Sequence, residues 1–165
     1  MKKALIIIDV QKGFINKLTT PVVGRIRNFI KKHQDDYDLL IFTQYFNRED
    51  SNFVRILKWR GFMAKKQTDL ADEIKEFVNS KNLFPKFTYG SFVDNKLLNL
   101  LKKNKIAQVE LAGFDTENCV LTFARDAFDR GMAVVVLKKL SASHSNPKLH
   151  QAALEIIKEN IGNVK

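Results

Sequence analysis

The chain has 165 residues, of which 45% are hydrophobic, and this length and composition predict one globular domain spanning residues 1–165. They exclude a disordered chain, a collagen-like repeat and a small disulfide-stabilised protein, the last because Cys119 is the only cysteine. The longest apolar runs, such as residues 4–8 and 133–137, are far shorter than the ~18 residues that a membrane-spanning helix needs. No cleavage site follows the first apolar stretch, so we expect a cytoplasmic protein with no membrane partner.

The charge is unbalanced, because 28 Lys and Arg against 18 Asp and Glu give a net charge of +10 at pH 7. Such a balance raises the hypothesis of nucleic-acid binding, which would weaken steeply with added salt. The basic residues are scattered in pairs along the chain, however, and no basic helix or zinc-finger spacing appears. We therefore interpret the charge as solvated surface and expect no nucleic-acid partner.

The first predicted elements are a strand, a helix and a second strand. Residues 3–10 are apolar and β-branched almost throughout, which is typical of a strand covered on both faces, and Asp9 stands near its end. A helix is predicted from Thr20, as its N-cap, to about His33. Residues 38–43 predict the second strand.

Residues 44–66 differ from the rest of the chain. They hold several aromatic residues, and their second half carries basic residues without an acidic one. Ser51 is predicted to cap a short helix that ends near Trp59. This composition favours a lid or a specificity segment, and an interface with a second subunit remains an alternative.

The second half of the chain alternates helices and strands. The predicted helices cover residues 71–78, 93–103, about 119–130 and 147–161, and the predicted strands cover residues 82–84, 107–112 and 133–137. This order predicts βαβ units and a mainly parallel sheet with helices on both faces. In such folds ligands bind outside the carboxyl ends of the strands.

Three reactive side chains are expected at that edge of the sheet. Asp9 ends the first strand, Lys86 follows the short strand near residue 84, and Cys119 lies where the loop after strand 107–112 turns into a helix. The positive end of the helix dipole and a nearby ammonium group are expected to lower the pKa of the Cys119 thiol. The three residues together predict a cysteine nucleophile, although each alone has an ordinary structural explanation.

No histidine is well placed to be the base for this cysteine. His33 falls at the end of a surface helix, and His144 and His150 lie beyond the last predicted strand. Asp9 could instead take the thiol proton and later give it to a leaving amine, with Lys86 keeping the pair balanced in charge.

At these residues the chain resembles the isochorismatase-like cysteine hydrolases, which include nicotinamidases and N-carbamoylsarcosine amidohydrolases. The resemblance covers nearly the whole chain. It rests on ALIIIDVQKGFI with Asp9, on PKFTYGSF with Lys86 and on LAGFDTENCVLTFARDAFDRG with Cys119.

The resemblance implies a three-layer α/β/α sandwich with a six-stranded, mainly parallel sheet and an Asp9, Lys86, Cys119 catalytic triad. It also implies a cis peptide between Asp115 and Thr116. The backbone N–H groups of Asp115 and Cys119 would then form an oxyanion hole.

The implied reaction is acyl transfer from a small amide or ureido substrate. Cys119 would attack the carbonyl carbon, an amine or ammonia would leave, and water would hydrolyse the thioester. The residues expected to bind the substrate are Phe14, Tyr45, Tyr89, Thr116 and Asn118.

The chain departs from nicotinamidases at their metal-binding Asp-x-His. Here Tyr45 and Asn47 occupy those two positions, and Asn118 stands where nicotinamidases often have histidine. A tyrosine and an amide make a poor zinc or iron site, so we predict no metal and no cofactor and consider nicotinamidase activity less favoured.

Two other functions stay open within the resemblance. One is hydrolysis of a vinyl ether, as in isochorismatases, which does not need the cysteine. The other is a binding scaffold that has kept the fold and lost catalysis. The resemblance further implies a homodimer or a homotetramer.

Overall fold

The computed structural model describes all 165 residues and contains one six-stranded sheet. Its strands lie in the order β3-β2-β1-β4-β5-β6, and every neighbouring pair is parallel. They are β1 (Lys3–Ile8), β2 (Leu39–Tyr45), β3 (Leu83–Lys86), β4 (Gln108–Phe114), β5 (Ala133–Ala142) and β6 (Asn163–Val164). The predicted six-stranded parallel sheet is confirmed.

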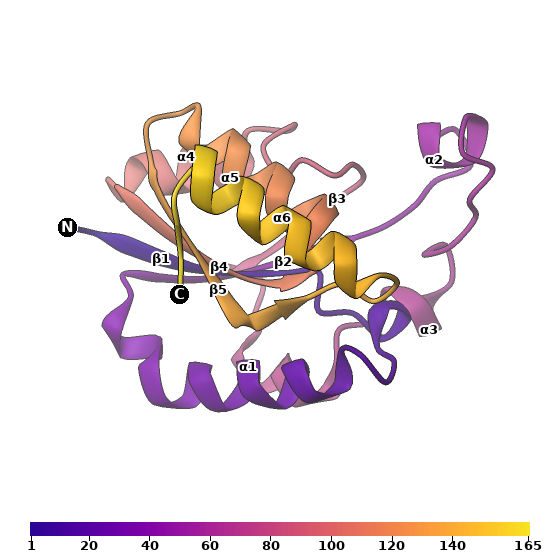
Figure 1. Ribbon diagram of the computed structural model, residues 1–165, viewed down its shortest axis with the longest axis horizontal. Helices are drawn as coiled ribbons and strands as arrows, with labels where there is room; N and C mark the ends of the chain where they lie inside the picture. The colour runs from indigo at the N-terminus through magenta and orange to yellow at the C-terminus, as the bar shows by residue number, and fades with distance from the viewer.

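Helices cover both faces of this sheet and make three layers (Figure 1). One face carries α1 (Thr20–His33), and the other carries α4 (Lys96–Lys103), α5 (Leu121–Phe128) and α6 (Pro147–Asn160). Two short helices, α2 (Asn52–Arg55) and α3 (Lys65–Thr68), lie in the excursion between β2 and β3, which projects from the sheet at the right of Figure 1.

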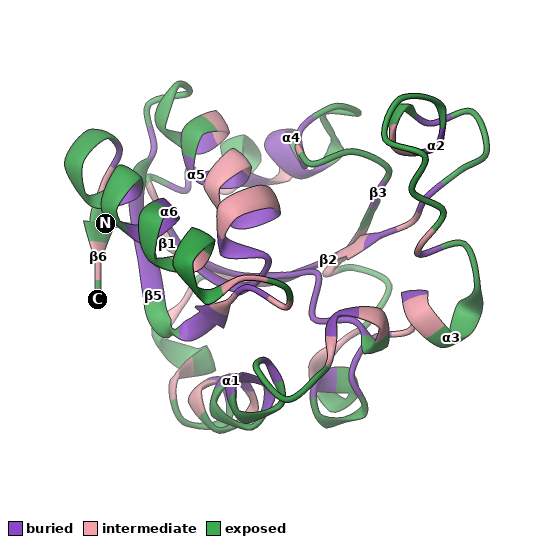
Figure 2. Cartoon of the chain, turned by 45° about the vertical axis from the view of Figure 1, so that its right-hand side comes forward, coloured by how far each residue is buried: buried purple, intermediate pink, exposed green.

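The central strand explains why residues 3–8 are apolar at every position after the first. Its side chains alternate between two cores: Ala4, Ile6 and Ile8 pack under α4, α5 and α6, whereas Leu5 and Ile7 pack against α1. Because β1 has a strand on each side and helices on each face, it shows no polar alternation. Figure 2 shows this buried centre in purple beneath exposed helix surfaces.

Several predicted boundaries differ from the observed ones. The N-cap of α1 is Thr19 rather than Thr20. Ser51 does cap α2, since its hydroxyl accepts from the Val54 N–H, but α2 ends at Arg55 and the positive φ of Lys58, 57°, prevents a helix reaching Trp59. The turns at Asp72–Phe77 are 3-10 rather than α-helical.

The largest difference concerns β5, which ends at Ala142 instead of residue 137. A register shift opposite Leu111 and Gly113 lets the strand continue past the two exposed residues Lys138 and Lys139. The extension carries the following residues, 143 and 144, to the carboxyl edge of the sheet.

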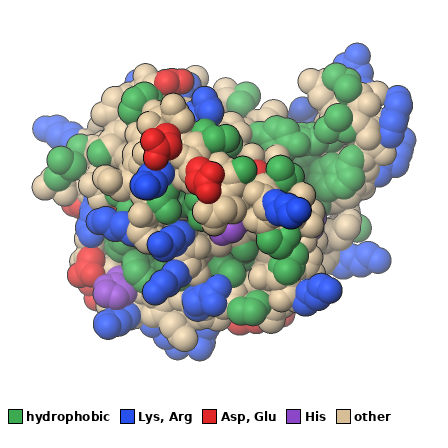
Figure 3. All heavy atoms as spheres, viewed as in Figure 1, with side chains coloured by type: hydrophobic (Ala, Val, Ile, Leu, Met, Phe, Trp, Pro, Cys, Tyr) green, Lys and Arg blue, Asp and Glu red, His purple; other side chains and the backbone are tan.

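On the face shown in Figure 3, Lys and Arg side chains predominate over acidic ones and gather in the lower part of the view, while hydrophobic side chains gather on the inner side of the projecting excursion. No helix combines the length and the apolar composition that crossing a membrane requires.

Gly113 is a position where only glycine fits. It has a φ of +118°, and a Cβ atom there would overlap the carbonyl oxygen of Ile8 in the neighbouring strand. We expect Gly113→Ala to lower the free energy of unfolding by at least ~2 kcal/mol, because the backbone of β1 would have to move. Thermal or urea unfolding measures this loss.

Gly24 provides the matched control. It lies inside α1, and a Cβ atom would meet no heavy atom within 4 Å. Gly24→Ala is expected to raise the free energy of unfolding by ~0.5–1 kcal/mol, because alanine favours the helix. Equal stability of the two variants would contradict the close approach at Gly113.

Candidate active site

The carboxyl edge of the sheet gathers the three predicted reactive side chains. Asp9 follows β1 with a φ of 50° and is fully buried, and Lys86 is the last residue of β3. Cys119 lies in a single π-helical turn, Thr116–Val120, that joins β4 to α5. The structure therefore brings together residues that are far apart in the chain.

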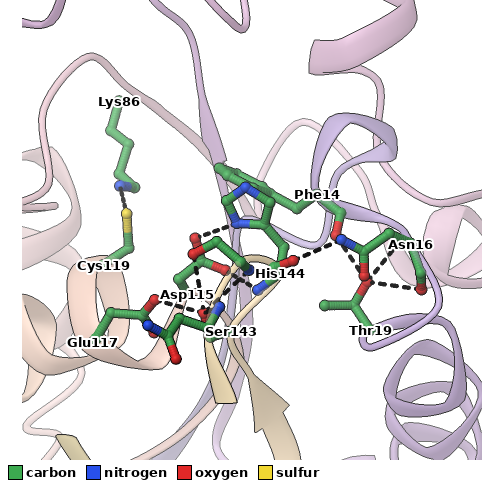
Figure 4. Close-up of polar contacts among 11 residues, drawn as sticks. Phe14, Asn16, Thr19, Lys86, Asp115, Glu117, Cys119, Ser143 and His144 are labelled. Atoms are coloured by element: carbon green, nitrogen blue, oxygen red, sulfur yellow. Dashed lines mark hydrogen bonds and ion pairs between the residues drawn. The ribbon is translucent and has the colours of Figure 1, made fainter. Parts of the chain in front are cut away.

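Lys86 contacts both of the other residues. Its Nζ lies 2.8 Å from Asp9 Oδ2. The same atom donates to Cys119 Sγ at 3.1 Å (Figure 4). It also donates to the carbonyl oxygens of Thr88 and Tyr89 at 3.0 and 3.2 Å, so the backbone that follows β3 helps to fix the ammonium group. The ammonium is thus the hub of the cluster.

Asp9 is held from the other side by β2. The Thr43 hydroxyl donates to Asp9 Oδ1 at 2.7 Å. Asp9 Oδ2 accepts no hydrogen bond from a hydroxyl or amide group, although it faces the Lys86 ammonium. That oxygen is the one available to receive a further proton.

The charged state of Lys86 is favoured in spite of burial. Burial lowers the pKa of its ammonium group, but the Asp9 carboxylate and the Cys119 sulfur beside it outweigh burial and raise the pKa above its ordinary value. Lys86 therefore acts as a fixed positive charge.

The expected low pKa of the cysteine is wrong for this structure. Burial raises the pKa of the Cys119 thiol to about 12, and this effect outweighs the Lys86 ammonium, which lowers it. The Asp9 carboxylate adds to the rise. The Lys86 ammonium lies beside the thiol as expected, but burial of the sulfur away from water has the larger effect on the pKa. The neutral thiol is therefore the favoured resting form.

The backbone at the end of β4 also differs from expectation. The cis peptide joins Phe114 to Asp115, one residue before the expected position between Asp115 and Thr116. Because β4 ends at Phe114, this bond directly follows the strand. The Asp115 N–H donates no hydrogen bond within the protein, although Asp115 is only 3% exposed.

A cavity of about 310 Å³ opens above Cys119. Four of the expected binding residues, Phe14, Tyr45, Tyr89 and Asn118, line it. Thr116 does not, and its assignment as a binding residue is corrected: the side chain is fully buried, and its hydroxyl lies 2.8 Å from His150 Nδ1 beneath α6.

The cavity has further lining residues that the sequence did not single out for binding. Three of them, Phe53, Leu57 and Trp59, come from the excursion between β2 and β3, and Asp115 and His144 come from the ends of β4 and β5. The aromatic content of residues 44–66 was a signal for the first group. No signal pointed to His144, because the predicted β5 ended too early.

Tyr45 has an unusual position in the cavity wall. Its ring stacks on Trp59 with centroids 6.2 Å apart, and the residue is 3% exposed. The buried hydroxyl has no hydrogen-bond partner. Burial, together with the neighbouring Cys119, raises the pKa of Tyr45, so the hydroxyl is a neutral donor.

The residues at the nicotinamidase metal position do not fit a metal ion. Asn47 uses its amide nitrogen on the carbonyl oxygens of Trp59 and Gly61 and its amide oxygen on Ser51 and the Arg48 N–H. Tyr45 offers only a neutral phenol beside it. A zinc or iron site prefers carboxylate, imidazole or thiolate donors, and this pair supplies none of them.

The isochorismatase domain model matches residues 3–164. An isochorismatase family protein of Bacillus subtilis (strain 168), named PncA and described as uncharacterized, is 28% identical over 179 aligned residues, covering 98% of this chain and 97% of that protein. Nicotinamidase 3 of Arabidopsis thaliana is 25% identical, covering 92% of this chain and 78% of that protein.

Solved structures are also similar to this chain. The crystal structure of nicotinamidase PncA from Bacillus subtilis has a TM-score of 0.86 at 25% identity, with 99% of each chain covered. N-carbamoylsarcosine amidase from Thermoplasma acidophilum shares the fold, with a TM-score of 0.84 at 24% identity and coverage of 100% of this chain and 96% of that one. Because the domain model spans nearly the whole sequence, the chain belongs to the isochorismatase family.

Proposed function

We propose that the protein is a cysteine hydrolase that cleaves a C–N bond of a small amide or ureido compound without a metal ion. The observation that carries this proposal is the Lys86 ammonium, which lies 2.8 Å from the Asp9 carboxylate and 3.1 Å from the Cys119 sulfur. A base, a fixed positive charge and a nucleophile then share one buried cluster. The amide-hydrolysing relatives among the family support the reaction class.

The first half of the reaction forms a thioester. Asp9 Oδ2 takes the thiol proton while Sγ bonds to the carbonyl carbon, and the carbonyl oxygen becomes an oxyanion. The backbone N–H groups of Asp115 and Cys119 would stabilise that oxygen, and the unpaired Asp115 N–H supports this role. The C–N bond then breaks, and the amine leaves with the proton that Asp9 received.

The second half consumes water. Asp9 accepts a proton from the water molecule while the water oxygen attacks the thioester carbon. The C–S bond then breaks, and the sulfur takes that proton from Asp9, which restores the neutral thiol. Lys86 compensates the negative charge on the sulfur in both halves. A neutral resting thiol fits this scheme, because negative charge develops on the sulfur only while Asp9 holds the proton.

The cavity suits a small, flat acyl group. Aromatic side chains, including Phe14, Tyr45 and Tyr89, form most of its wall, and Asn118 adds a polar side chain next to Cys119. The unpartnered Tyr45 hydroxyl would donate a hydrogen bond to a substrate acceptor. It would take the place that a metal ion serves in nicotinamidases.

The first test removes the nucleophile. We expect Cys119→Ala to lower kcat/KM by a factor on the order of 10⁴ or more, because no thioester can form, while the melting temperature stays near that of the wild type. Hydrolysis of nicotinamide, N-carbamoylsarcosine and isochorismate would be measured for both proteins. Full activity on an amide in the variant would end the proposal.

Two other results in that assay favour the other functions. Isochorismate hydrolysis that survives Cys119→Ser would favour a vinyl ether hydrolase. A wild-type protein that hydrolyses no amide, ureido compound or vinyl ether, with a thiol that stays unreactive, would favour a binding scaffold.

The second test follows alkylation of Cys119 by iodoacetamide against pH. Because the thiol pKa is raised, the wild-type rate is expected to keep rising above pH 9 instead of levelling near the free-thiol value of ~8.5. Asp9→Asn removes a carboxylate that raises this pKa and should shift the profile to lower pH. Lys86→Met removes the opposing ammonium and should shift it to higher pH.

Lys75→Met is the matched control, since Lys75 forms an exposed ion pair with Asp72 far from the thiol. Its profile should match the wild type. If the Asp9→Asn and Lys86→Met variants both keep the wild-type pH profile, the three groups are not coupled.

The third test concerns Tyr45. Tyr45→Phe removes a hydroxyl that pairs with nothing in the protein, so we expect the melting temperature to stay or rise while KM increases by ~3–10-fold. Tyr37→Phe is the control, because Tyr37 does not line the cavity and its hydroxyl donates to Glu110 Oε2 at a distance of 2.8 Å. It should lower stability and leave KM unchanged. A Tyr45→Phe protein with unchanged KM would remove this residue from substrate binding.

A further inference from the structure

A histidine outside the triad also faces the cavity. His144 lies two residues after β5, lines the same cavity as Cys119 and has a side chain that is 35% exposed. It plays no part in the proposed acyl transfer. Figure 4 shows its ring beside Asp115, apart from the Lys86 and Cys119 pair.

Asp115 holds His144 by two contacts. One carboxylate oxygen lies 2.6 Å from His144 Nδ1, and the other accepts the backbone N–H of His144 at 2.8 Å. Asn16 donates to the His144 carbonyl oxygen at 2.6 Å, and the Phe14 ring packs edge-on with centroids 5.1 Å apart. The ring is therefore fixed in one orientation.

This pairing decides what the second ring nitrogen can do. A carboxylate accepts, so Nδ1 carries a proton and donates to Asp115. Nε2 has no hydrogen-bond partner in the protein. It is an acceptor while the ring is neutral and a donor when the ring is an imidazolium.

The groups around the ring favour the imidazolium. The hydrogen bond to Asp115 raises the pKa of His144 against the opposing effect of burial, and Glu117, from the π-helical turn, acts in the same direction. Glu117 is held by Ser143, whose hydroxyl donates to Oε1 at 2.6 Å. The other titratable side chains that line the cavity are Cys119, Tyr45, Tyr89 and Asp115. The pKa values of the first three are raised, so they add no charge at neutral pH, and Asp115 is the carboxylate already paired with the ring.

No other cation of the cavity is free for a ligand. The Lys86 ammonium is occupied by Asp9, Cys119 and two carbonyl oxygens. No other Lys or Arg side chain lines the cavity.

We propose that His144, oriented by Asp115, is a specificity-determining residue that binds a carboxylate of the substrate through Nε2–H. The substrate class is then a small amide or ureido compound that also carries a carboxylate. This inference deepens the proposed function and rests on it for the reaction, but binding at His144 can be measured without turnover.

The test compares two alkylating agents that differ in one group. Iodoacetate and iodoacetamide have the same leaving group and nearly the same size, but only iodoacetate is a carboxylate. At pH 6.5 we expect the ratio of the Cys119 alkylation rates, iodoacetate over iodoacetamide, to exceed the ratio for glutathione. His144→Gln should lower this ratio by on the order of tenfold, as expected for the loss of a charge-assisted hydrogen bond, with little change in the iodoacetamide rate.

The matched control is His33→Gln. His33 also pairs with a carboxylate, with Nδ1 2.9 Å from Asp36 Oδ2, but it lies on the surface at the end of α1. This variant should keep the wild-type ratio, which separates recognition in the cavity from the general attraction of a basic protein. Raising the salt concentration should reduce only that general attraction.

Three outcomes would overturn the proposal. An unchanged ratio in His144→Gln would show that His144 does not contact the carboxylate. Equal loss of both rates would assign it a structural role, and a ratio favouring iodoacetamide that His144→Gln abolishes would show that Nε2 accepts from an N–H group.

A second measurement avoids the thiol altogether. Binding of succinamate, an amide with a carboxylate, and of neutral succinamide would be followed by calorimetry on Cys119→Ala and on Cys119→Ala with His144→Gln. Tighter binding of succinamate that disappears in the double variant is expected. Equal binding of the two compounds, or no dependence on His144, would refute carboxylate recognition even if the protein hydrolyses other amides.

Discussion

The buried ion pair between Lys86 and Asp9 is the constraint on which the rest of the site depends. Removing two charges from water costs several kcal/mol per ion, so each charge needs partners that are fixed in place. Asp9 accepts a hydrogen bond from the Thr43 hydroxyl, and the Lys86 ammonium donates to two carbonyl oxygens and to the sulfur of Cys119. These partners come from β1, β2, the end of β3 and the turn after β4, and therefore the site can form only when the sheet has assembled.

The strand order divides the polar groups of the cavity into two centres. The strands β1, β2 and β3 supply the Asp9 and Lys86 pair, whereas the ends of β4 and β5 supply Asp115 and His144. Cys119 lies on the turn that follows β4, and β4 pairs with β1 at the point where the strand order reverses. The carboxyl edge at such a switch point is where open parallel sheets bind their ligands. The excursion between β2 and β3 covers the cavity with aromatic and aliphatic side chains.

Charge is distributed differently inside the cavity and on the surface. The protein carries a net charge of +10, yet the ammonium beside the Cys119 sulfur is matched by a carboxylate, and burial raises the pKa of the thiol and favours its neutral form. In the same surroundings the interaction between Lys86 and a thiolate is stronger than it would be in water. The proposed reaction uses this property, since a thiolate forms only after the proton has moved to Asp9. The apolar wall thus acts on the chemistry as well as on the fit of the substrate.

The sequence determined the alternation of strands and helices, the buried central strand and the identity of the three side chains at its carboxyl edge, because hydrophobic periodicity and strand-end residues are local signals. It did not determine the length of β5, since a register shift depends on the neighbouring strand, and it therefore gave no indication that His144 lies in the cavity. It also led to the wrong pKa direction for Cys119 and the wrong assignment of Thr116, because both depend on which atoms exclude water after packing. Local pattern specified the three side chains at the carboxyl edge of the sheet, and only the tertiary structure decided which residues line the cavity and in what electrostatic surroundings, because both depend on packing between distant segments.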